Sequence, residues 1–193
     1  LGYLIGQHTF FECIRLTKPA TIMSYNVRTG QLKNNFYWTW SDVKKNSITF
    51  DDAIDCFGTL FLESVKRRID TPKAVGVALS GGLDSRAIVA AVASLEPDYR
   101  GYCYTFGRTG SQDYKIAQQV AEVAKWRHEI FELSEHNWLK PRLPVVIATD
   151  GMADIKHLHG VEFGEYLQSQ IGINLNGYLG DVVAGGGWIS KLH

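Results

Sequence analysis

The chain has 193 residues, and its 20 lysines and arginines are balanced by 20 aspartates and glutamates. A hydrophobic fraction of 45% with 21% charged residues excludes a disordered or low-complexity chain. Zero formal net charge argues against a general nucleic-acid or membrane-surface binder, because both need a basic excess for long-range attraction. No apolar run is long enough to span a bilayer, and the spacing of Cys13, Cys56 and Cys103 argues against a disulfide framework or a zinc site. We therefore expect a cytoplasmic protein.

The first 41 residues are expected to be β structure. Side chains that favour strands are concentrated at 9–14, 21–25 and 32–40, and turns at Lys18-Pro19 and Arg28-Thr29-Gly30 separate these runs. Two or three antiparallel strands are too few to make a core alone. We therefore predict that residues 1–41 are the last strands of a preceding domain, and the absence of an initiator Met favours a piece of a longer protein.

Residues 42–193 are predicted to form an α/β domain. Thr49 is a good N-cap for a helix that continues to about residue 68, because acidic residues follow it and basic residues end the helical pattern. Beyond this helix, expected strands alternate with expected helices: strands at 74–79, 101–106, 129–133 and 171–175, helices at 85–94 and 113–125. This alternation is typical of a parallel, doubly wound sheet, which binds ligands at the carboxyl ends of its strands. Glycine-rich turns at 80–82 and 177–187 follow two of these strands.

The turn after the first parallel strand has the features of a phosphate site. Gly81 and Gly82 allow the backbone N–H groups to approach a ligand closely, and the N-terminus of the next helix adds partial positive charge. Ser80 and Ser85 can donate hydrogen bonds to phosphate oxygens, and Asp84 would repel a bare phosphate, which indicates a bridging Mg²⁺. From the glycines alone, a plain strand-to-helix turn capped by Asp84 is an equally good interpretation.

The whole hexapeptide is more specific. Ser80-Gly81-Gly82-Leu83-Asp84-Ser85 resembles the pyrophosphate-binding loop of the ATP pyrophosphatases, which include asparagine, GMP and NAD synthetases; it is not a Walker loop, because the Lys and the longer spacing are missing. Segments 104–107, 112–117, 126–130 and 176–186 resemble the asparagine synthetase family in particular. Segments 10–14, 18–20 and 36–38 resemble the tail of that family's glutaminase-type domain.

The resemblance implies a set of roles for residues in this chain. It places Mg²⁺ on Asp84 and Asp181, adenine and ribose on Ala78, Phe106, Asn176 and Gly177, and pyrophosphate on Ser80, Gly81, Gly82, Leu83, Asp84 and Ser85. The implied reaction is ATP-dependent amide formation, in which a carboxylate is adenylated and AMP and pyrophosphate are released. For an asparagine synthetase, the substrates would be aspartate and ammonia from glutamine. The resemblance allows a homodimer and implies no nucleic-acid or membrane partner.

Departures from the family pattern leave alternatives open. Tyr178 stands where asparagine synthetases carry Glu, Val182 replaces an acidic residue, and Arg86 replaces a Ser. A Tyr at this position resembles the β-lactam synthetases, in which it acts as a base, so Tyr178 is a candidate catalytic residue of a lactam or macrolactam synthetase. Packing of Tyr178 beside the nucleotide is an equally good interpretation, and a non-catalytic nucleotide-binding module is a third possibility.

Two elements that the complete reaction needs are missing from the sequence. The family's glutaminase uses an N-terminal Cys, and its C-terminal helices carry a Lys that would follow His193. We therefore expect the chain to bind ATP without completing amide synthesis. His157 and His159 have i, i+2 spacing and lack a third ligand, so we do not expect a metal site there.

Overall fold

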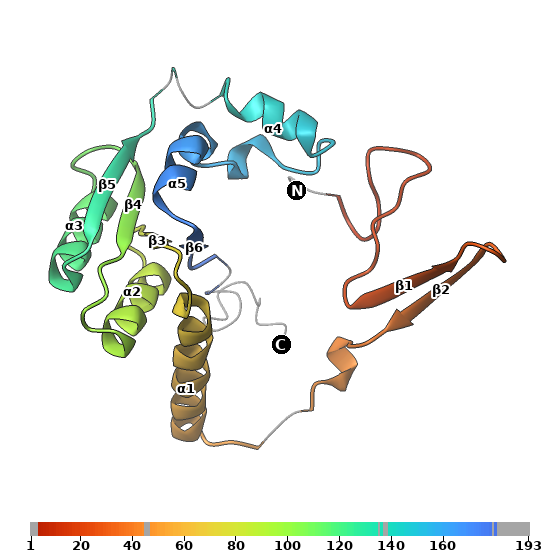
Figure 1. The fold of residues 1–193 in the computed structure, drawn as a ribbon, viewed down its shortest axis with the longest axis horizontal. Helices are drawn as coiled ribbons and strands as arrows, with labels where there is room; N and C mark the ends of the chain where they lie inside the picture. Colours follow the sequence, from red (N-terminus) through yellow and green to blue (C-terminus); the bar gives the residue numbers. More distant parts are fainter. Residues whose placement is uncertain (1–3, 45–46, 135, 137–138, 179, 181–193) are drawn as a thin grey trace, which may run out of the picture.

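The computed structural model describes residues 4–44, 47–134, 136, 139–178 and 180. In this part of the chain a short antiparallel hairpin is followed by alternating helices and parallel strands (Figure 1). The elements are β1 (Thr21–Asn26), β2 (Gln31–Phe36), η1 (Trp40–Asp42), α1 (Phe50–Ile69), β3 (Val75–Ala78), α2 (Leu83–Leu95), β4 (Tyr102–Gly107), α3 (Gln112–Ala124), β5 (Arg127–Glu132), α4 (Arg142–Ala148), η2 (Ile155–His157), η3 (Val161–Phe163), α5 (Gly164–Gln170) and β6 (Ile173–Leu175).

The four-stranded sheet is parallel and has the strand order β5-β4-β3-β6. From β3 the chain proceeds through α2 and α3 to β4 and β5 on one side, and it later adds β6 on the other side. The order of the strands therefore reverses between β3 and β6, and in open α/β sheets ligands bind at this point. The predicted α/β fold with a parallel, doubly wound sheet is confirmed.

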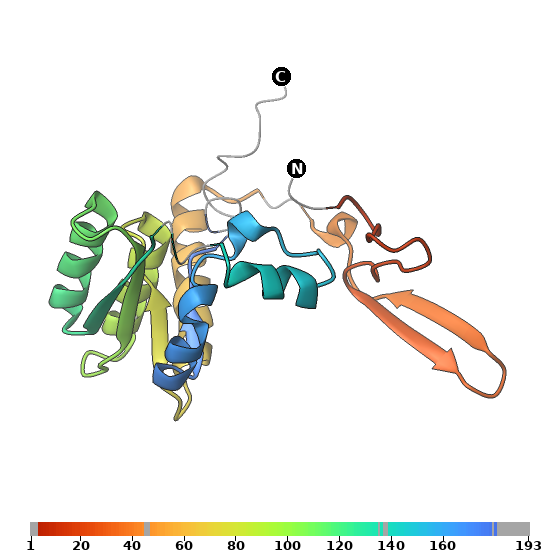
Figure 2. The ribbon, with the colours of Figure 1, turned by 90° about the horizontal axis from the view of Figure 1, so that it is seen from above.

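Each face of the parallel sheet has its own hydrophobic core. One core joins α1, α2 and α3 to the sheet through residues such as Val77, Val92 and Cys103. The other lies under α5 and η3 and contains Tyr104 and Phe131. Successive residues of β4 alternate between these cores, as expected for a strand covered on both faces. Figure 2 shows the sheet between its helices from a second direction.

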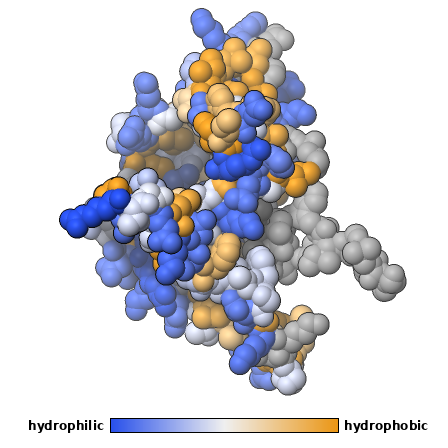
Figure 3. All heavy atoms as spheres, turned by 90° about the vertical axis from the view of Figure 1, so that its right-hand side faces the viewer, coloured by the Kyte–Doolittle hydropathy of each residue, from blue (hydrophilic) through white to orange (hydrophobic). Residues whose placement is uncertain are grey.

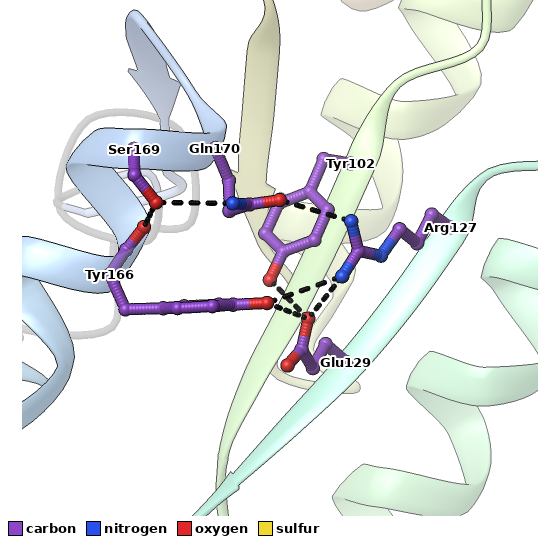
Figure 4. Close-up of polar contacts among 6 residues, drawn as sticks. All are labelled: Tyr102, Arg127, Glu129, Tyr166, Ser169 and Gln170. Carbon is purple, nitrogen blue, oxygen red and sulfur yellow. Dashed lines mark hydrogen bonds and ion pairs between the residues drawn. The ribbon is translucent and has the colours of Figure 1, made fainter.

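A polar cluster fixes α5 to the strands β4 and β5 (Figure 4). The hydroxyls of Tyr102 and Tyr166 donate hydrogen bonds to Glu129 Oε2 at 2.8 and 3.0 Å, and Arg127 contacts the same oxygen at 3.0 Å. Arg127 also donates to Gln170 Oε1 at the end of α5. Burial raises the pKa of Tyr102 well above its ordinary value, and its hydrogen bond to Glu129 adds to the shift. The cluster is centred near the start of β4 and β5, so it contributes to packing rather than to a site at the carboxyl ends.

The hairpin β1–β2 projects from the body that contains the parallel sheet (Figures 1 and 2). Its register pairs Met23 with Asn34 and Tyr25 with Leu32, so one face carries the apolar side chains Met23, Tyr25, Leu32 and Phe36. These four side chains are about half exposed. Figure 3, viewed toward this end of the molecule, shows hydrophobic atoms at the surface among hydrophilic ones. The hairpin therefore has an apolar face that remains about half exposed, with Lys18 Nζ over the ring of Phe36 at 5.7 Å from its centroid.

Most of the predicted elements are present within a few residues of their expected bounds. Thr49 caps α1, since its side chain accepts a hydrogen bond from the N–H of Asp52. The strand predicted at 9–14 was wrong: this segment forms turns, with Thr9 Oγ1 bonded to both the N–H and the carbonyl of Phe11. None of the helices in the described part of the chain is long and apolar enough to cross a membrane.

Candidate functional site

The glycine loop connects the end of β3 to the start of α2. Gly81 has φ +53°, in the left-handed region, and a Cβ there would lie 3.0 Å from the Cα of Asp113. Only glycine therefore allows the loop to pass this close to the first turn of α3. Gly82 is the N-cap of α2 and supplies no capping side chain, which leaves N–H groups of the first turn for a ligand.

The two serines of the loop have different environments. Ser85 is 3% exposed, and its hydroxyl donates to the carbonyl of Gly82 at 3.2 Å and accepts from the N–H of Ser80 at 3.2 Å. It therefore holds the loop closed from inside. Ser80 is exposed and lines a cavity. Arg86, which departs from the family pattern, donates from Nε to the same Gly82 carbonyl.

The second glycine motif packs directly against Asp84. A Cβ on Gly177 would lie 2.6 Å from Asp84 Cβ, and a Cβ on Gly180 would lie 2.7 Å from Asp84 Cγ. An Asx turn, in which the N–H of Tyr178 donates to Asn176 Oδ1, begins this motif after β6. The structure thus brings the two predicted glycine motifs together at the switch point between β3 and β6. Asp181, the second predicted Mg²⁺ contact, lies outside the described residues.

Two cavities flank the loop, and the residues expected on adenine and ribose are divided between them. The first has a volume of about 320 Å³ and is lined by Ala78, Leu79, Ser80, Tyr104, Thr105, Phe106, Asp113, Leu133 and His159. The second, about 260 Å³, is lined by Phe57, Phe61, Asp84, Ala87, Ile88, Asn176, Gly177, Tyr178 and Gly180. Ala78 and Phe106 therefore line one cavity, whereas Asn176 and Gly177 line the other beside Asp84.

Six of the nine lining residues of the first cavity were not predicted as site residues: Leu79, Tyr104, Thr105, Asp113, Leu133 and His159. Asp113 lies in the first turn of α3, beside Gly81, and its place after β4 is a signal that sequence analysis could have used. Tyr104 donates its hydroxyl to Asn174 Oδ1 at 2.8 Å, and burial raises its pKa. His159 reaches the cavity because Gly160, with φ +89°, packs under the ring of Phe106. This long-range contact has no local sequence signal.

Oxygen donors, rather than a cluster of metal-binding side chains, characterise this site. Within the described ranges, no three His, Cys, Asp or Glu side chains are grouped as a metal centre. His157 Nδ1 lies 3.6 Å from Asp154 Oδ2, away from the glycine loop. Asp84 and Asp113 are the carboxylates beside the loop. Mg²⁺ is commonly held by one or two carboxylates together with substrate phosphates, so this donor set fits that ion.

Two curated proteins are similar to part of this chain. The chain is 28% identical over 136 residues to asparagine synthetase [glutamine-hydrolyzing] 2 of Bacillus subtilis, covering 68% of this chain and 17% of the relative. It is 32% identical over 119 residues to asparagine synthetase [glutamine-hydrolyzing] 2 of Arabidopsis thaliana, covering 57% of this chain and 20% of the relative. The chain thus spans about a fifth of the length of these curated relatives.

Solved structures with weaker likeness also match. A predicted subunit of a tRNA methyltransferase from Methanocaldococcus jannaschii is 21% identical, with 54% of this chain and 52% of that chain covered and a TM-score of 0.34. NMN synthetase from Francisella tularensis is 15% identical, with 60% and 50% covered and a TM-score of 0.38. The family model described as asparagine synthase matches residues 57–191, which include the glycine loop and the whole parallel sheet. The predicted family is confirmed, and the chain belongs to the asparagine synthase family.

Proposed function

We propose that this chain contains the nucleotide-binding part of an ATP-dependent ligase that adenylates a carboxylate and forms an amide. The observation that carries the proposal is the packing of Gly177 and Gly180 against Asp84, directly beside the open N-terminus of α2. This packing places backbone N–H groups, a carboxylate and two cavities around one point at the carboxyl edge of the sheet. Such an edge suits a nucleoside triphosphate, whose phosphates bind the helix N-terminus.

Different parts of the site are proposed to bind the phosphates and the nucleoside of ATP. The N–H groups of the glycine loop and the hydroxyl of Ser80 bind phosphate oxygens, and Ser85 keeps the loop in shape. The cavity beside Phe106 receives the nucleoside. A substrate carboxylate then attacks the α-phosphorus, pyrophosphate leaves, and an amine displaces AMP from the acyl-adenylate. Aspartate and ammonia from glutamine are the substrates proposed for the whole protein.

Asp84 is the residue proposed to hold Mg²⁺, together with Asp181. Asp84 is exposed, and the contacts among the described residues include no hydrogen bond or ion pair to its carboxylate. Mg²⁺ would neutralise charge on the phosphates of ATP. Asp113 lies beside Gly81, where a Cβ would be 3.3 Å from Asp113 Oδ1, and it would supply a second carboxylate near such an ion.

We also propose that residues 1–41 belong to a different domain from residues 42–193. The apolar face of the hairpin, with Tyr25 and Phe36 each more than half exposed, needs a partner sheet to be stable in water. In a glutaminase-type domain, the preceding strands would cover this face.

The proposed function is tested by titrating the chain with ATP in the presence and absence of Mg²⁺. We expect Mg²⁺-dependent binding in a calorimeter. When the full-length protein that contains this chain is incubated with ATP, aspartate and glutamine, it should produce AMP and pyrophosphate. Production of ADP and phosphate would contradict the proposed role of the loop. Binding of ATP without any turnover would instead favour a non-catalytic nucleotide-binding module.

Tyr178 decides between an amide synthetase and a lactam-type synthetase. Its side chain is 80% exposed and lines the cavity that contains Asp84. A phenol that acts as a base near neutral pH needs a charged partner, and no described residue hydrogen-bonds its hydroxyl. We therefore expect Tyr178→Phe to leave ATP binding unchanged and to keep the rate of AMP formation within about twofold. A loss of about a hundredfold in rate, with unchanged binding, would favour the lactam-type synthetase.

A further inference from the structure

Thr105 makes two short hydrogen bonds behind the glycine loop. Its Oγ1 donates to the carbonyl of Leu79 at 2.6 Å and lies 2.8 Å from His128 Nε2. Thr105 is 4% exposed, so water does not replace either partner readily. A hydroxyl has one proton, and here that proton is directed to a carbonyl, which can only accept. Thr105 must therefore accept from His128, and Nε2 of the imidazole must carry a hydrogen.

His128 is suited to this fixed donor role. Burial lowers the pKa of its ring below the ordinary value, an effect that Glu122 partly opposes, so the ring is neutral at neutral pH. The imidazole stacks on Tyr114 with a centroid separation of 5.7 Å and an interplanar angle of 25°. The stacking and the hydrogen bond together fix the orientation of the ring and leave Nδ1 without a proton.

These contacts are part of a network of residues that connects the glycine loop with α3 beside the first cavity. Leu79 directly precedes the glycine loop, and both Leu79 and Thr105 line the cavity. Tyr114, under the imidazole, lies in the same helical turn as Asp113, whose backbone contacts Gly81. The N–H of Tyr114 is bonded to the capping side chain of Ser111, so this turn is itself fixed. The loop is thus held at its start through Leu79 and at its middle through Gly81, by one network that spans β4, β5 and α3.

We propose that Thr105 and His128 are positioning residues that fix the glycine loop in its nucleotide-binding conformation. The proposal rests on the proposed function, because the nucleotide is the ligand of that loop. Neither side chain is needed to touch a phosphate. Their effect passes through the Leu79 carbonyl, which sets where the peptide of Ser80 begins and therefore where the loop N–H groups point.

The first test uses Thr105→Val and Thr105→Ser with Mg-ATP titration. Valine keeps the shape but removes the hydroxyl, which leaves the Leu79 carbonyl and the His128 N–H without partners, so we expect roughly tenfold weaker binding. Serine keeps the hydroxyl and should restore binding to near that of the unsubstituted chain. Thr59→Val is the matched control. Thr59 is an exposed residue of α1 whose hydroxyl donates to the carbonyl of Asp55 in the same helix. The affinity of the Thr59→Val variant for Mg-ATP should equal that of the unsubstituted chain.

The second test is independent of ATP and of how well Thr105→Val folds. Nitrogen-15 NMR of the unsubstituted chain should show His128 as the tautomer with hydrogen on Nε2, and Thr105→Ser should keep it. A tautomer with hydrogen on Nδ1 would overturn the proposal directly. Equal Mg-ATP affinity of the unsubstituted chain and Thr105→Val would also overturn it. Absence of ATP binding by the unsubstituted chain would instead contradict the proposed function.

Discussion

Replacing Asp84 with asparagine should weaken Mg-ATP binding by about a hundredfold or more, since even outer partners of metal ligands commonly contribute 10- to 100-fold to metal affinity. The substitution keeps the size of the side chain and its place at the start of α2 but removes the negative charge that Mg²⁺ requires. Calorimetric titration with ATP in excess Mg²⁺, and again with a chelator, measures the effect. The difference between the two conditions should be large for the unsubstituted chain and almost absent for the variant.

Asp98→Asn is the control for this loss of charge. Asp98 is an exposed residue between α2 and β4, at the opposite edge of the sheet from the glycine loop. The substitution changes the net charge of the chain by the same amount, and we expect Mg-ATP affinity to be unaltered. Equal Mg²⁺-dependence in the unsubstituted chain and Asp84→Asn would show that the carboxylate of Asp84 does not hold the metal.

Gly177→Ala is expected to have a comparably large effect for a steric reason. The new methyl group would lie 2.6 Å from Asp84 Cβ, 3.1 Å from the backbone nitrogen of Ser85 and 3.2 Å from Asp84 C. Backbone atoms at such distances cannot turn aside as a flexible side chain can, so either the chain after β6 or the first turn of α2 must move. Since a misplacement of about 1 Å can cost about a hundredfold in a positioned site, we expect ATP binding to fall by that order.

Gly58→Ala provides the matched comparison for Gly177→Ala. A Cβ on Gly58, within α1, meets nothing within 4 Å. We expect unchanged ATP affinity and a free energy of unfolding that is higher by about 0.5–1 kcal/mol, because alanine favours a helix interior over glycine. Thermal unfolding of both variants shows whether a loss of ATP affinity results from unfolding or from a local change at the site. Normal ATP affinity in Gly177→Ala would contradict the proposed packing of the second motif on Asp84.

The sequence was sufficient to predict the helices and parallel strands of residues 50–133 and the strand β6, but α4, η2, η3 and α5, which lie between them, were not predicted. The helices and buried strands that were predicted have a clear hydrophobic periodicity or a capping residue, such as Thr49 before α1. These local features alone are enough to identify the elements. The segment 9–14 was mistaken for a strand because β-forming side chains do not reveal whether a partner strand exists. There, hydrogen bonds from Thr9 to nearby backbone groups form turns instead.

The site was predictable only in part. Both glycine motifs and Asp84 were found because their spacing and position after a strand are local features. The contributions of Thr105 and His159 to one cavity depend on contacts between strands and loops that are distant in sequence. The same reason explains why Asn176 and Phe106, expected on one nucleoside, line separate cavities.

The position of β6 has a consequence for how the molecule is made. Residue 75 of β3 pairs with residue 173 of β6, so the central strand acquires its second neighbour only after nearly the whole parallel sheet has been synthesised. Pairing over such a sequence separation is slow, because a long loop must close before any contact is gained. Until β6 is synthesised, β3 therefore has one unpaired edge, and Asp84 lacks the two glycines, Gly177 and Gly180, that later pack against it. On the proposed function, a nascent chain would bind ATP only after β6 has joined the sheet.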